Sequence, residues 1–396
     1  MTEAEGKSRL RVLFLEPFNG GSHAAFAQGL AGHSAHEVVV SGLPPRHWKW
    51  RMHGAALTFS EEYADRRRRG ESWDLILLTS LIDVSDFRAR ICRSTGPHPP
   101  LLFYLHETQF DYPSDLGADR DARYGFRNLL SLVASDYALF NSASHRRRFL
   151  ADAESFLRTL PKPVPKGLIR EARAKSGVLY PGVEGPRVVS RTNKDKDRGN
   201  RGCFTFKHDR KGPLILWNHR WEHDKNPDVF FSALQAIDTP QLPWQLAVAG
   251  ERYRHAPPVF AEAREKLDHR IAHFGYLEER AAYRRLLEES DIVVSTSRQE
   301  NFGLSVVEAI LAGAIPLLPS RLSYPELLPR EAHDLLLYGS DGELPGLLRL
   351  VLQSPDRFRS VADLAEARLR NYRWEYQAPR FDRVMERIAE RSCEAG

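Results

Sequence analysis

Runs of apolar residues, almost uninterrupted by polar ones, recur through the first half of the chain. They cover residues 10–18, 36–43, 73–80, 99–107 and 137–142. Such runs are typical of strands that are buried on both faces of a parallel sheet. Residues 24–34 and 122–136 lie between them and carry apolar side chains at helical spacing. Because strands and helices alternate with short connections, the pattern predicts an α/β sheet covered by helices.

The same pattern resumes in the second half of the chain. Its expected strands are residues 212–220, 244–251, 271–277, 291–297 and 314–320, and its expected helices are residues 228–237 and 279–290. Between the halves, residues 187–211 are polar, strongly basic and without periodicity, as in a linker or an extended surface loop. The sequence therefore predicts a Rossmann-like N-terminal domain (1–186), a basic linker or insert (187–211), a Rossmann-like C-terminal domain (212–372) and a terminal helix (373–396).

Length and composition agree with two globular domains. A chain of 396 residues is too long for one ordinary core. It contains no run of about 18 apolar residues that would span a membrane, and its acidic N-terminus does not resemble a signal peptide. Three scattered cysteines do not suit a disulfide framework, so we expect a reducing, cytoplasmic location. The net charge of +5 suits a polyanionic partner without requiring one.

Chemistry is expected after the strands, because ligands of open parallel sheets bind outside the carboxyl ends of the strands. Gly20, Gly21, Ser22 and His23 follow the first strand. Paired glycines let the backbone approach a phosphate or a sugar, although they also occur in ordinary strand-to-helix turns. The spacing is not the Gly-x-Gly-x-x-Gly fingerprint, so a nicotinamide cofactor is not indicated. His106 follows a later strand and is either a substrate contact or a structural histidine.

Two cations follow the first strand of the second half. Arg220 and Lys225 are five positions apart in the loop and are candidates to clamp a diphosphate, since arginine offers a fork and lysine a point charge. His219 and His223 have the spacing of paired metal ligands on a helix. Pro227 argues against a helix there and no third ligand is apparent, so we predict no metal.

Two weaker signals follow the next strands. Gly250 and Glu251 end one strand where small residues leave room for a base or a ribose. Gly275 and Tyr276 end another, and their backbone is a candidate wall of the same pocket.

Two glutamates flank the start of an apolar helix in the second half. Glu300 lies in the loop after residues 291–297, and Glu308 lies in the helix that follows. Ser305 and Glu308 have the spacing of a capping box, which is the structural explanation for Glu308. The functional alternative is a nucleotide-sugar site, in which the carboxylates accept hydrogen bonds from hydroxyls and the amides at the helix start hold a phosphate. Its residues would be Glu300, Asn301, Phe302, Gly303, Leu304 and Glu308.

Taken in order, these motifs resemble the retaining GT-B glycosyltransferases of family 4. The resemblance rests on the glycine loop, Arg-x4-Lys, Glu-x7-Glu and a terminal helix that begins with tryptophan. More narrowly, "EPFNGGSHAAFAQGL", "WKWRM", "HETQFDYP", "YGFRNLLS", "WNHRWEHDKNP" and "SRLSYPELLP" are similar to the tRNA-queuosine alpha-mannosyltransferases, over residues 11 to 340. The resemblance implies a GT-B fold with two Rossmann-like domains facing a cleft and a terminal helix that crosses back to the N-terminal domain.

The resemblance also implies a reaction and roles for the residues. The donor would be GDP-mannose, and the acceptor a hydroxyl of the cyclopentenediol of queuosine in a tRNA anticodon. Arg220 and Lys225 would bind the diphosphate, Glu300 the sugar hydroxyls, and Glu308 the ribose. His106 would lie near the reacting centre, and the glycine loop beside the diphosphate or the acceptor. Front-face attack would retain the configuration, with no metal or enzymic nucleophile, because cations and helix amides stabilise the leaving group.

Basic residues beside aromatic ones support an RNA acceptor. Trp48, Lys49, Trp50 and Arg51 combine charges for the backbone with rings for a splayed base. Further basic clusters at 66–69 and 146–148 are either RNA contacts or solvated helix faces. Two other functions stay open. One is the same fold acting on a small-molecule, lipid or glycan acceptor; the other is a nucleotide- or RNA-binding protein without catalysis. The sequence does not indicate an oligomeric state.

Overall fold

The computed structural model describes residues 9–95, 97–110, 122–165, 167–185, 212–252 and 256–394. The expected basic segment 187–211 lies outside these residues, as do positions 111–113 of the "HETQFDYP" motif. The chain forms two compact units, Met1–Val183 with Tyr372–Gly396, and Glu184–Asn371. The divisions lie near the expected boundaries at 186 and 372, and the C-terminal segment belongs to the first unit.

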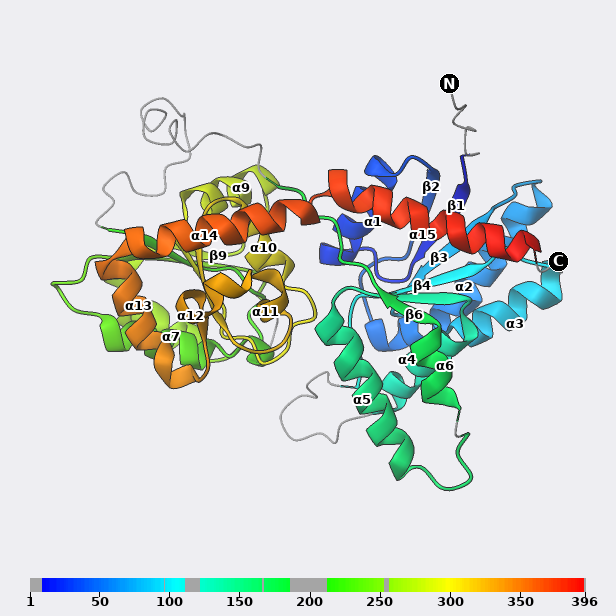
Figure 1. Cartoon of the computed structure of the whole chain (residues 1–396), viewed down its shortest axis with the longest axis horizontal. Coiled ribbons are helices and arrows are strands. Elements are labelled where there is room, and N and C mark those ends of the chain that lie inside the picture. Colours follow the sequence, from blue (N-terminus) through cyan, green and yellow to red (C-terminus); the bar gives the residue numbers. More distant parts are fainter. Residues whose placement is uncertain are drawn as a thin grey trace. The chain divides into compact units, whose positions relative to one another are not determined.

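Unit 1 is built on a parallel sheet in the order β2-β1-β3-β4-β5-β6. Its strands are β1 (Arg11–Glu16), β2 (Glu37–Gly42), β3 (Leu75–Thr79), β4 (Leu101–Leu105), β5 (Tyr137–Phe140) and β6 (Ser176–Val178). Its helices are α1 (Gly21–His33), α2 (Trp48–Arg68), α3 (Val84–Thr95), α4 (Ala122–Ala134), α5 (Ala143–Thr159), α6 (Leu168–Ala174) and α15 (Trp374–Glu394). Figure 1 shows these elements along the chain.

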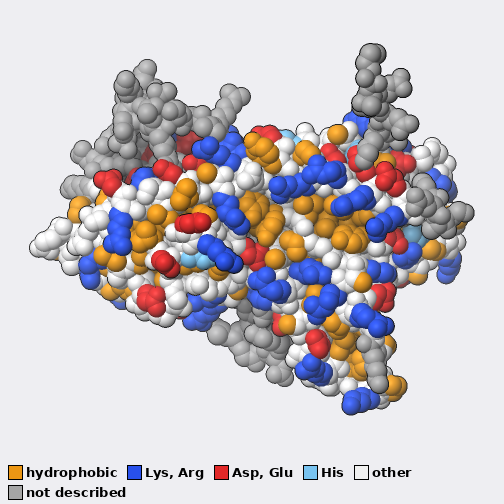
Figure 2. Space-filling model, viewed as in Figure 1, with side chains coloured by type: hydrophobic (Ala, Val, Ile, Leu, Met, Phe, Trp, Pro, Cys, Tyr) orange, Lys and Arg blue, Asp and Glu red, His pale blue; other side chains and the backbone are white. Residues whose placement is uncertain are grey.

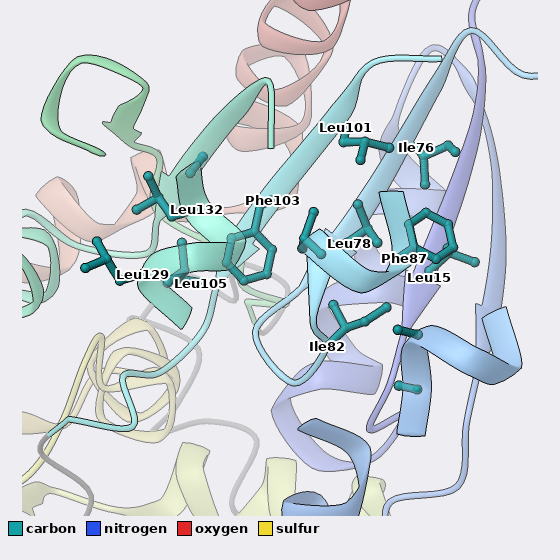
Figure 3. Packing of buried hydrophobic residues seen from close by; sticks show 14 of the residues in the cluster. Leu15, Ile76, Leu78, Ile82, Phe87, Leu101, Phe103, Leu105, Leu129 and Leu132 are labelled. Carbon is teal, nitrogen blue, oxygen red and sulfur yellow. The ribbon is translucent and has the colours of Figure 1, made fainter. Parts of the chain in front are cut away.

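Alternate residues of each central strand enter different cores, one on each face of the sheet. Leu13, Leu15, Ile76, Leu78 and Phe103 belong to the core that α2 to α6 complete, part of which Figure 3 shows. Their sequence neighbours, such as Val12 and Leu77, pack instead against α1 and α15. Successive side chains of a strand point to opposite faces, so a continuous apolar run serves both cores.

The C-terminal helix α15 completes one of these cores. Trp374, Phe381 and Met385 of this helix are buried against α1 and the sheet. Gly29 and Gly182 make room for the indole, because a Cβ atom at either would lie 2.1 Å from a Trp374 ring atom. Removing a buried side chain of this size typically costs about 3–5 kcal/mol, so unit 1 depends on the end of the chain for its stability.

Unit 2 contains a second parallel sheet in the order β12-β11-β10-β7-β8-β9. Its strands are β7 (Leu214–Trp217), β8 (Gln245–Ala249), β9 (Ile271–Gly275), β10 (Ile292–Val294), β11 (Ile315–Pro319) and β12 (Leu337–Tyr338). Its helices are α7 (Pro227–Ile237), α8 (Val259–Lys266), α9 (Arg280–Glu289), α10 (Leu304–Leu311), α11 (Tyr324–Leu327), α12 (His333–Leu336), α13 (Leu344–Gln353) and α14 (Pro355–Leu369). The expectation of two Rossmann-like α/β domains is confirmed. Among the described residues, none of the helices combines the length and apolar character needed to cross a membrane.

Candidate functional site

The loops after β7 and β8 lie against each other at the carboxyl edge of the unit 2 sheet. Gly250 has φ +152°, and a Cβ atom there would lie 1.8 Å from the carbonyl oxygen of His219. The Trp221 amide donates to the carbonyl of Glu251 at 3.0 Å. Only glycine permits this approach, which fixes the start of the loop that carries Arg220 and Lys225.

Lys225 lies in a 3₁₀ turn, His223–Lys225, directly before α7. Its ammonium group is buried and has three oxygen partners: the carbonyl of Gln299 at 2.8 Å, Asp224 Oδ2 at 3.0 Å and Glu300 Oε2 at 3.5 Å. The loop after β7 and the loop after β10 are therefore joined through one cation. Lys225 and Glu300, which are separated by 74 intervening positions in the sequence, are therefore in direct contact.

Glu300 organises the start of α10. Its Oε1 accepts hydrogen bonds from the amides of Asn301 (3.1 Å), Phe302 (3.4 Å) and Gly303 (3.1 Å). Gly303 is the N-cap with φ +95°, a conformation that favours glycine. The Gly303 amide thus donates within the protein in this structure, and its expected place beside the phosphate or the sugar stays a prediction. A phosphate can also meet the following amides of α10, beginning at Leu304.

Electrostatics keep both members of the pair charged. Burial opposes the ammonium of Lys225, but Glu300 and Asp224 outweigh burial and raise its pKa. Burial also opposes the Glu300 carboxylate, but Lys225, His219 and the amides of Phe302 and Asn301 lower its pKa. Burial and then Lys225 lower the pKa of His219 to about 4, so its ring is neutral at pH 7. His219 Nε2 is buried and has no hydrogen-bond partner among the described residues.

Asn301 and Phe302 are buried, whereas three other candidates of the unit 2 loops have exposed or partly exposed side chains. The Arg220 side chain is 41% exposed and forms an ion pair with Glu222 at 3.1 Å. Tyr276, which directly follows β9, is 60% exposed, and Glu251 is also exposed. An exposed ring and guanidinium beside buried charges are available to a ligand without reorganising the core.

Glu308 does not form the expected capping box. Helix α10 begins at Leu304 and its N-cap residue is Gly303, which has no side chain to cap it, so Ser305 lies one position too far into the helix to act as the N-cap. Glu308 lies one turn further along the helix, where it accepts from the Tyr283 hydroxyl at 3.4 Å. Asn218 in turn donates to that hydroxyl at 3.0 Å. Burial raises the pKa of Glu308 to about 7, against the pull of Arg280.

Glu308 also lines a small pocket on unit 2. Its other lining residues are Glu184, Arg280, Tyr283, Arg284, Leu287 and Ala312. A carboxylate between a hydroxyl and two guanidinium groups offers both acceptors and donors to a polar ligand.

In unit 1 the glycine loop leads into α1 at the end of β1. Gly21 has φ +53°, and a Cβ atom at Gly20 would lie 2.5 Å from Pro45. Ser22 is exposed, whereas His23 is buried in the first turn of α1. His23 Nδ1 lies 3.0 Å from Glu16 Oε1, and Nε2 lies 3.1 Å from Glu107 Oε2. Burial opposes its charge, yet these two carboxylates raise the pKa of His23 well above its ordinary value.

His106 packs beside His23 at the end of β4. The two ring centroids are 4.2 Å apart. Burial, followed by His23 and His145, lowers the pKa of His106 well below its ordinary value, so this ring is neutral. Ser80 accepts the His106 amide hydrogen at 2.7 Å, and Asn141 donates to the His106 carbonyl at 2.7 Å. The structure thus brings the glycine loop and His106 together at the carboxyl edge of the sheet, although β3 lies between β1 and β4.

Known proteins share both halves of this architecture. Residues 11–183 match the N-terminal domain of tRNA-queuosine alpha-mannosyltransferase, and residues 204–350 match glycosyl transferases group 1. The tRNA-queuosine alpha-mannosyltransferase of Drosophila melanogaster is 32% identical over 361 residues, which are 89% of each chain. The chain belongs to the tRNA-queuosine alpha-mannosyltransferase family.

Solved structures confirm the fold of this family member. Sucrose-phosphate synthase from Thermosynechococcus elongatus aligns with a TM-score of 0.68 at 14% identity, over 96% of this chain and 99% of that one. Anabaena Alr3699/HepE, solved in complex with UDP, aligns with a TM-score of 0.62 at 14% identity, over 97% of this chain and all of that one. The GT-B expectation is confirmed, and the tRNA-queuosine alpha-mannosyltransferase family with its group 1 domain makes the chain a hexosyltransferase.

The candidate RNA contacts lie on helices. Trp48, Lys49, Trp50 and Arg51 form the first turn of α2, where Trp50 is 61% exposed. Trp48 packs edge-on against Tyr124, with ring centroids 5.4 Å apart. Trp50 is therefore the ring of the motif that is most open to a base.

The two arginine clusters are parts of helices α2 and α5. Arg66 forms ion pairs with Glu62 and Glu71, and Arg146 donates to Ser176 and to the Arg173 carbonyl. These two side chains thus serve the structure of unit 1. Figure 2 shows further Lys and Arg side chains over α5, α6 and α15 on the face that it displays.

Sequence reasoning missed several polar residues of these sites. Asp224, Asn218 and Tyr283 support the predicted unit 2 residues, and Glu16 and Glu107 hold His23. Glu16 ends an apolar run and has no exposed surface. The signal in the sequence was the position of the Glu16 carboxylate at the end of a buried strand, because a buried charge requires polar partners nearby.

Proposed function

We propose that this chain transfers mannose from GDP-mannose to the queuosine base of a tRNA anticodon, with retention of configuration. The carrying observation is the contact of Lys225 with Glu300 at the carboxyl edge of the unit 2 sheet, in a chain whose Drosophila relative is named a tRNA-queuosine alpha-mannosyltransferase. A buried cation joined to a carboxylate suits a donor that carries a diphosphate next to a polyol. A tRNA acceptor would place the enzyme in the cytoplasm.

The donor would bind along the ends of β7, β8, β9 and β10. Arg220 would reach the diphosphate with its exposed guanidinium. Lys225 would follow by exchanging its longest contact, the one of 3.5 Å to Glu300, for a phosphate oxygen. The released Glu300 oxygen would then accept hydrogen bonds from the sugar hydroxyls. Gly250, Glu251 and Tyr276 would border the nucleotide.

Glu308 would bind the ribose in the pocket that it lines. Its charge is needed for strong acceptance from the two ribose hydroxyls, and it titrates near neutrality with a pKa of about 7. Donor binding would draw the proton off this carboxyl.

The transfer step would need no protein nucleophile. The acceptor oxygen forms its bond to the anomeric carbon on the face from which the diphosphate departs. The leaving phosphate oxygen takes the acceptor proton, and its remaining charge is stabilised by Arg220 and Lys225. Because these cations can supply the electrostatic stabilisation of the leaving group, we propose a reaction without a metal.

The experiment incubates the protein with bulk tRNA that contains queuosine and with a panel of nucleotide sugars, followed by mass analysis of the digested nucleosides. We expect one added hexose on queuosine, only with GDP-mannose, and none on tRNA that lacks queuosine. Cleavage of the product by an α-specific but not a β-specific mannosidase would establish retention. Absence of any hexose on queuosine with every donor would overturn the proposal and point to another acceptor.

A further inference from the structure

Three charged side chains form a continuous chain of contacts at the carboxyl edge of the unit 1 sheet. Glu16 ends β1, His23 lies in the first turn of α1, and Glu107 follows β4. His23 lies between the carboxylates, 3.0 Å from Glu16 Oε1 and 3.1 Å from Glu107 Oε2. Since the pKa of His23 is raised, it donates to both as an imidazolium. The chain of contacts holds Glu107 in one orientation.

The two carboxylates differ in how completely they are used. Glu16 is fully buried and accepts from the Phe18 amide at 2.9 Å and from the Thr79 hydroxyl at 2.9 Å, besides His23. Glu107 keeps about a fifth of its side chain exposed, and its Oε1 has no hydrogen-bond partner among the described residues. An anchored carboxylate with one uncommitted oxygen is a site for a hydrogen-bond donor, because leaving that oxygen without a partner is costly.

A second buried polar atom of this kind belongs to the preceding residue, His106. His106 Nε2 is buried and has no partner within the described part of the chain, and the His106 ring packs 4.2 Å from that of His23. The neutral His106 ring donates or accepts according to its tautomer. His106 and Glu107 are the two residues that directly follow β4, so a neutral imidazole and a carboxylate with an available acceptor oxygen leave the same strand.

A metal ion explains this cluster less well. Ligand atoms of Glu16, His23 and His106 lie within 4.8 Å of one another. However, both ring nitrogens of His23 already face carboxylate oxygens, and a metal would require one of them to be free as a neutral donor. Hydrogen bonding by a charged imidazole accounts for both contacts without that loss.

We propose that Glu107 binds the vicinal diol of the acceptor, with His106 beside it, and that Glu16 and His23 are positioning residues that orient the Glu107 carboxylate. This inference rests on the proposed queuosine acceptor, whose cyclopentenediol has two adjacent hydroxyls. One hydroxyl donates to Glu107 Oε1, and the second can meet the same carboxylate or His106. Glu107 orients the diol and does not take its proton, which leaves with the phosphate.

The test compares two tRNAs that differ only in the diol. One carries queuosine, and the other carries the same deazaguanine base without the cyclopentenediol ring; binding to the full-length protein is measured without donor. Wild type should bind the queuosine tRNA about 10- to 100-fold more tightly, as expected for hydrogen bonds to a charged group. Glu107→Gln should lose most of this preference, and Glu107→Asp should restore part of it. An unchanged preference in Glu107→Gln would overturn the proposal.

Asp83→Asn is the matched control. Asp83 follows the neighbouring strand β3, and its carboxylate is also partly exposed, with an ion pair to Arg127. It should leave the diol preference intact, whereas an equal loss in both variants would show a general effect of removing charge and would refute a specific role.

A double-mutant cycle tests the positioning residue. His23→Gln should raise the KM for tRNA without changing the KM for the nucleotide sugar, and it should have no further effect in the Glu107→Gln background. Independent effects would contradict the linkage. Stoichiometric zinc that copurifies with wild type and is lost in His23→Gln would favour the metal reading instead. If wild type transfers no hexose to queuosine, the proposed function fails; if it transfers but Glu107→Gln behaves as wild type, only this inference fails.

Discussion

Replacing Glu300 by glutamine separates the role that we propose for this residue in donor binding from its structural role at the start of α10. Glutamine has nearly the same shape, and its carbonyl oxygen can still accept from the amides of Asn301, Phe302 and Gly303. It removes only the charge that faces Lys225 and, in the proposed complex, the sugar hydroxyls. Alanine at the same position removes both functions.

The structure sets the size of each effect. A hydrogen bond to a charged group contributes about 1.5–3 kcal/mol and a neutral one about 0.5–1.5 kcal/mol. Glu300→Gln should therefore destabilise unit 2 by about 1 kcal/mol, or roughly 2–4 °C in Tm for a domain of this size. Losing about 1.5–3 kcal/mol of transition-state binding should lower kcat/KM about 10- to 150-fold, at about 1.36 kcal/mol per tenfold change.

The assay combines thermal melting with initial rates of hexose transfer to queuosine tRNA. Glu300→Ala should lose about 2–4 kcal/mol of stability, because three amides lose their acceptor. Glu343→Gln is the matched control, since Glu343 also accepts a backbone amide, from Gly339 at 2.9 Å, outside the proposed site. A kcat/KM for the donor within about twofold of wild type in Glu300→Gln would refute the assignment and leave Glu300 a structural residue.

Three further variants test other parts of the molecule. Burial holds the Glu308 pKa at about 7, above its ordinary 4.5, so its stabilising effect is complete below about pH 4.5 and is lost as the pH rises through 7. The Tm of wild type should therefore fall relative to that of Glu308→Gln as the pH rises from 4.5 to 7. Parallel curves of Tm against pH for the two proteins would disprove the raised pKa. Trp50→Ala should raise the KM for tRNA about 10-fold with unchanged Tm. Tyr376→Ala, which removes a similarly exposed ring from α15, should leave that KM unchanged, and equal KM values in the two variants would exclude stacking on Trp50. Gly250→Ala should weaken nucleotide binding and lower Tm more than Gly275→Ala, because both glycines have positive φ but only at Gly250 would a Cβ atom meet a carbonyl oxygen, at 1.8 Å. Nucleotide titration and thermal melting measure the two effects, and equal values in the two variants would contradict this reasoning.

Much of the fold could be predicted because strands that are buried on both faces of a parallel sheet consist almost entirely of apolar residues. The run 73–80, for example, contains β3, whose five residues are all buried. Helix α2 was not predicted as an element, and its first turn was read only as an RNA motif. Its signal was present, because Met52, Ala55, Ala56, Phe59 and Tyr63 are buried at helical spacing. Its many charged residues obscured that pattern.

The candidate sites were only partly predictable, because spacing along a chain does not give distances in space. The Arg-x4-Lys and Glu-x7-Glu motifs pointed to Lys225 and Glu300, but they gave neither the direct contact between the two side chains nor the additional contacts of Lys225 with Asp224 and Gln299. The capping box was wrong because α10 begins at Leu304 with Gly303 as its N-cap, so Ser305 lies inside the first turn and not at the N-cap position that the motif requires. Glu107 was missed since its role depends on His23, which is 84 positions away.

The placement of α15 has a consequence for how the protein is made. The backbone of Val183 pairs with Tyr372 and Arg373, and Trp374, Phe381 and Met385 fill the core that the first residues of the chain began. A ribosome that has finished the first half has therefore not yet supplied the side chains that this core needs. The nascent N-terminal half must wait, with apolar surface uncovered, until α15 has been translated and has left the exit tunnel.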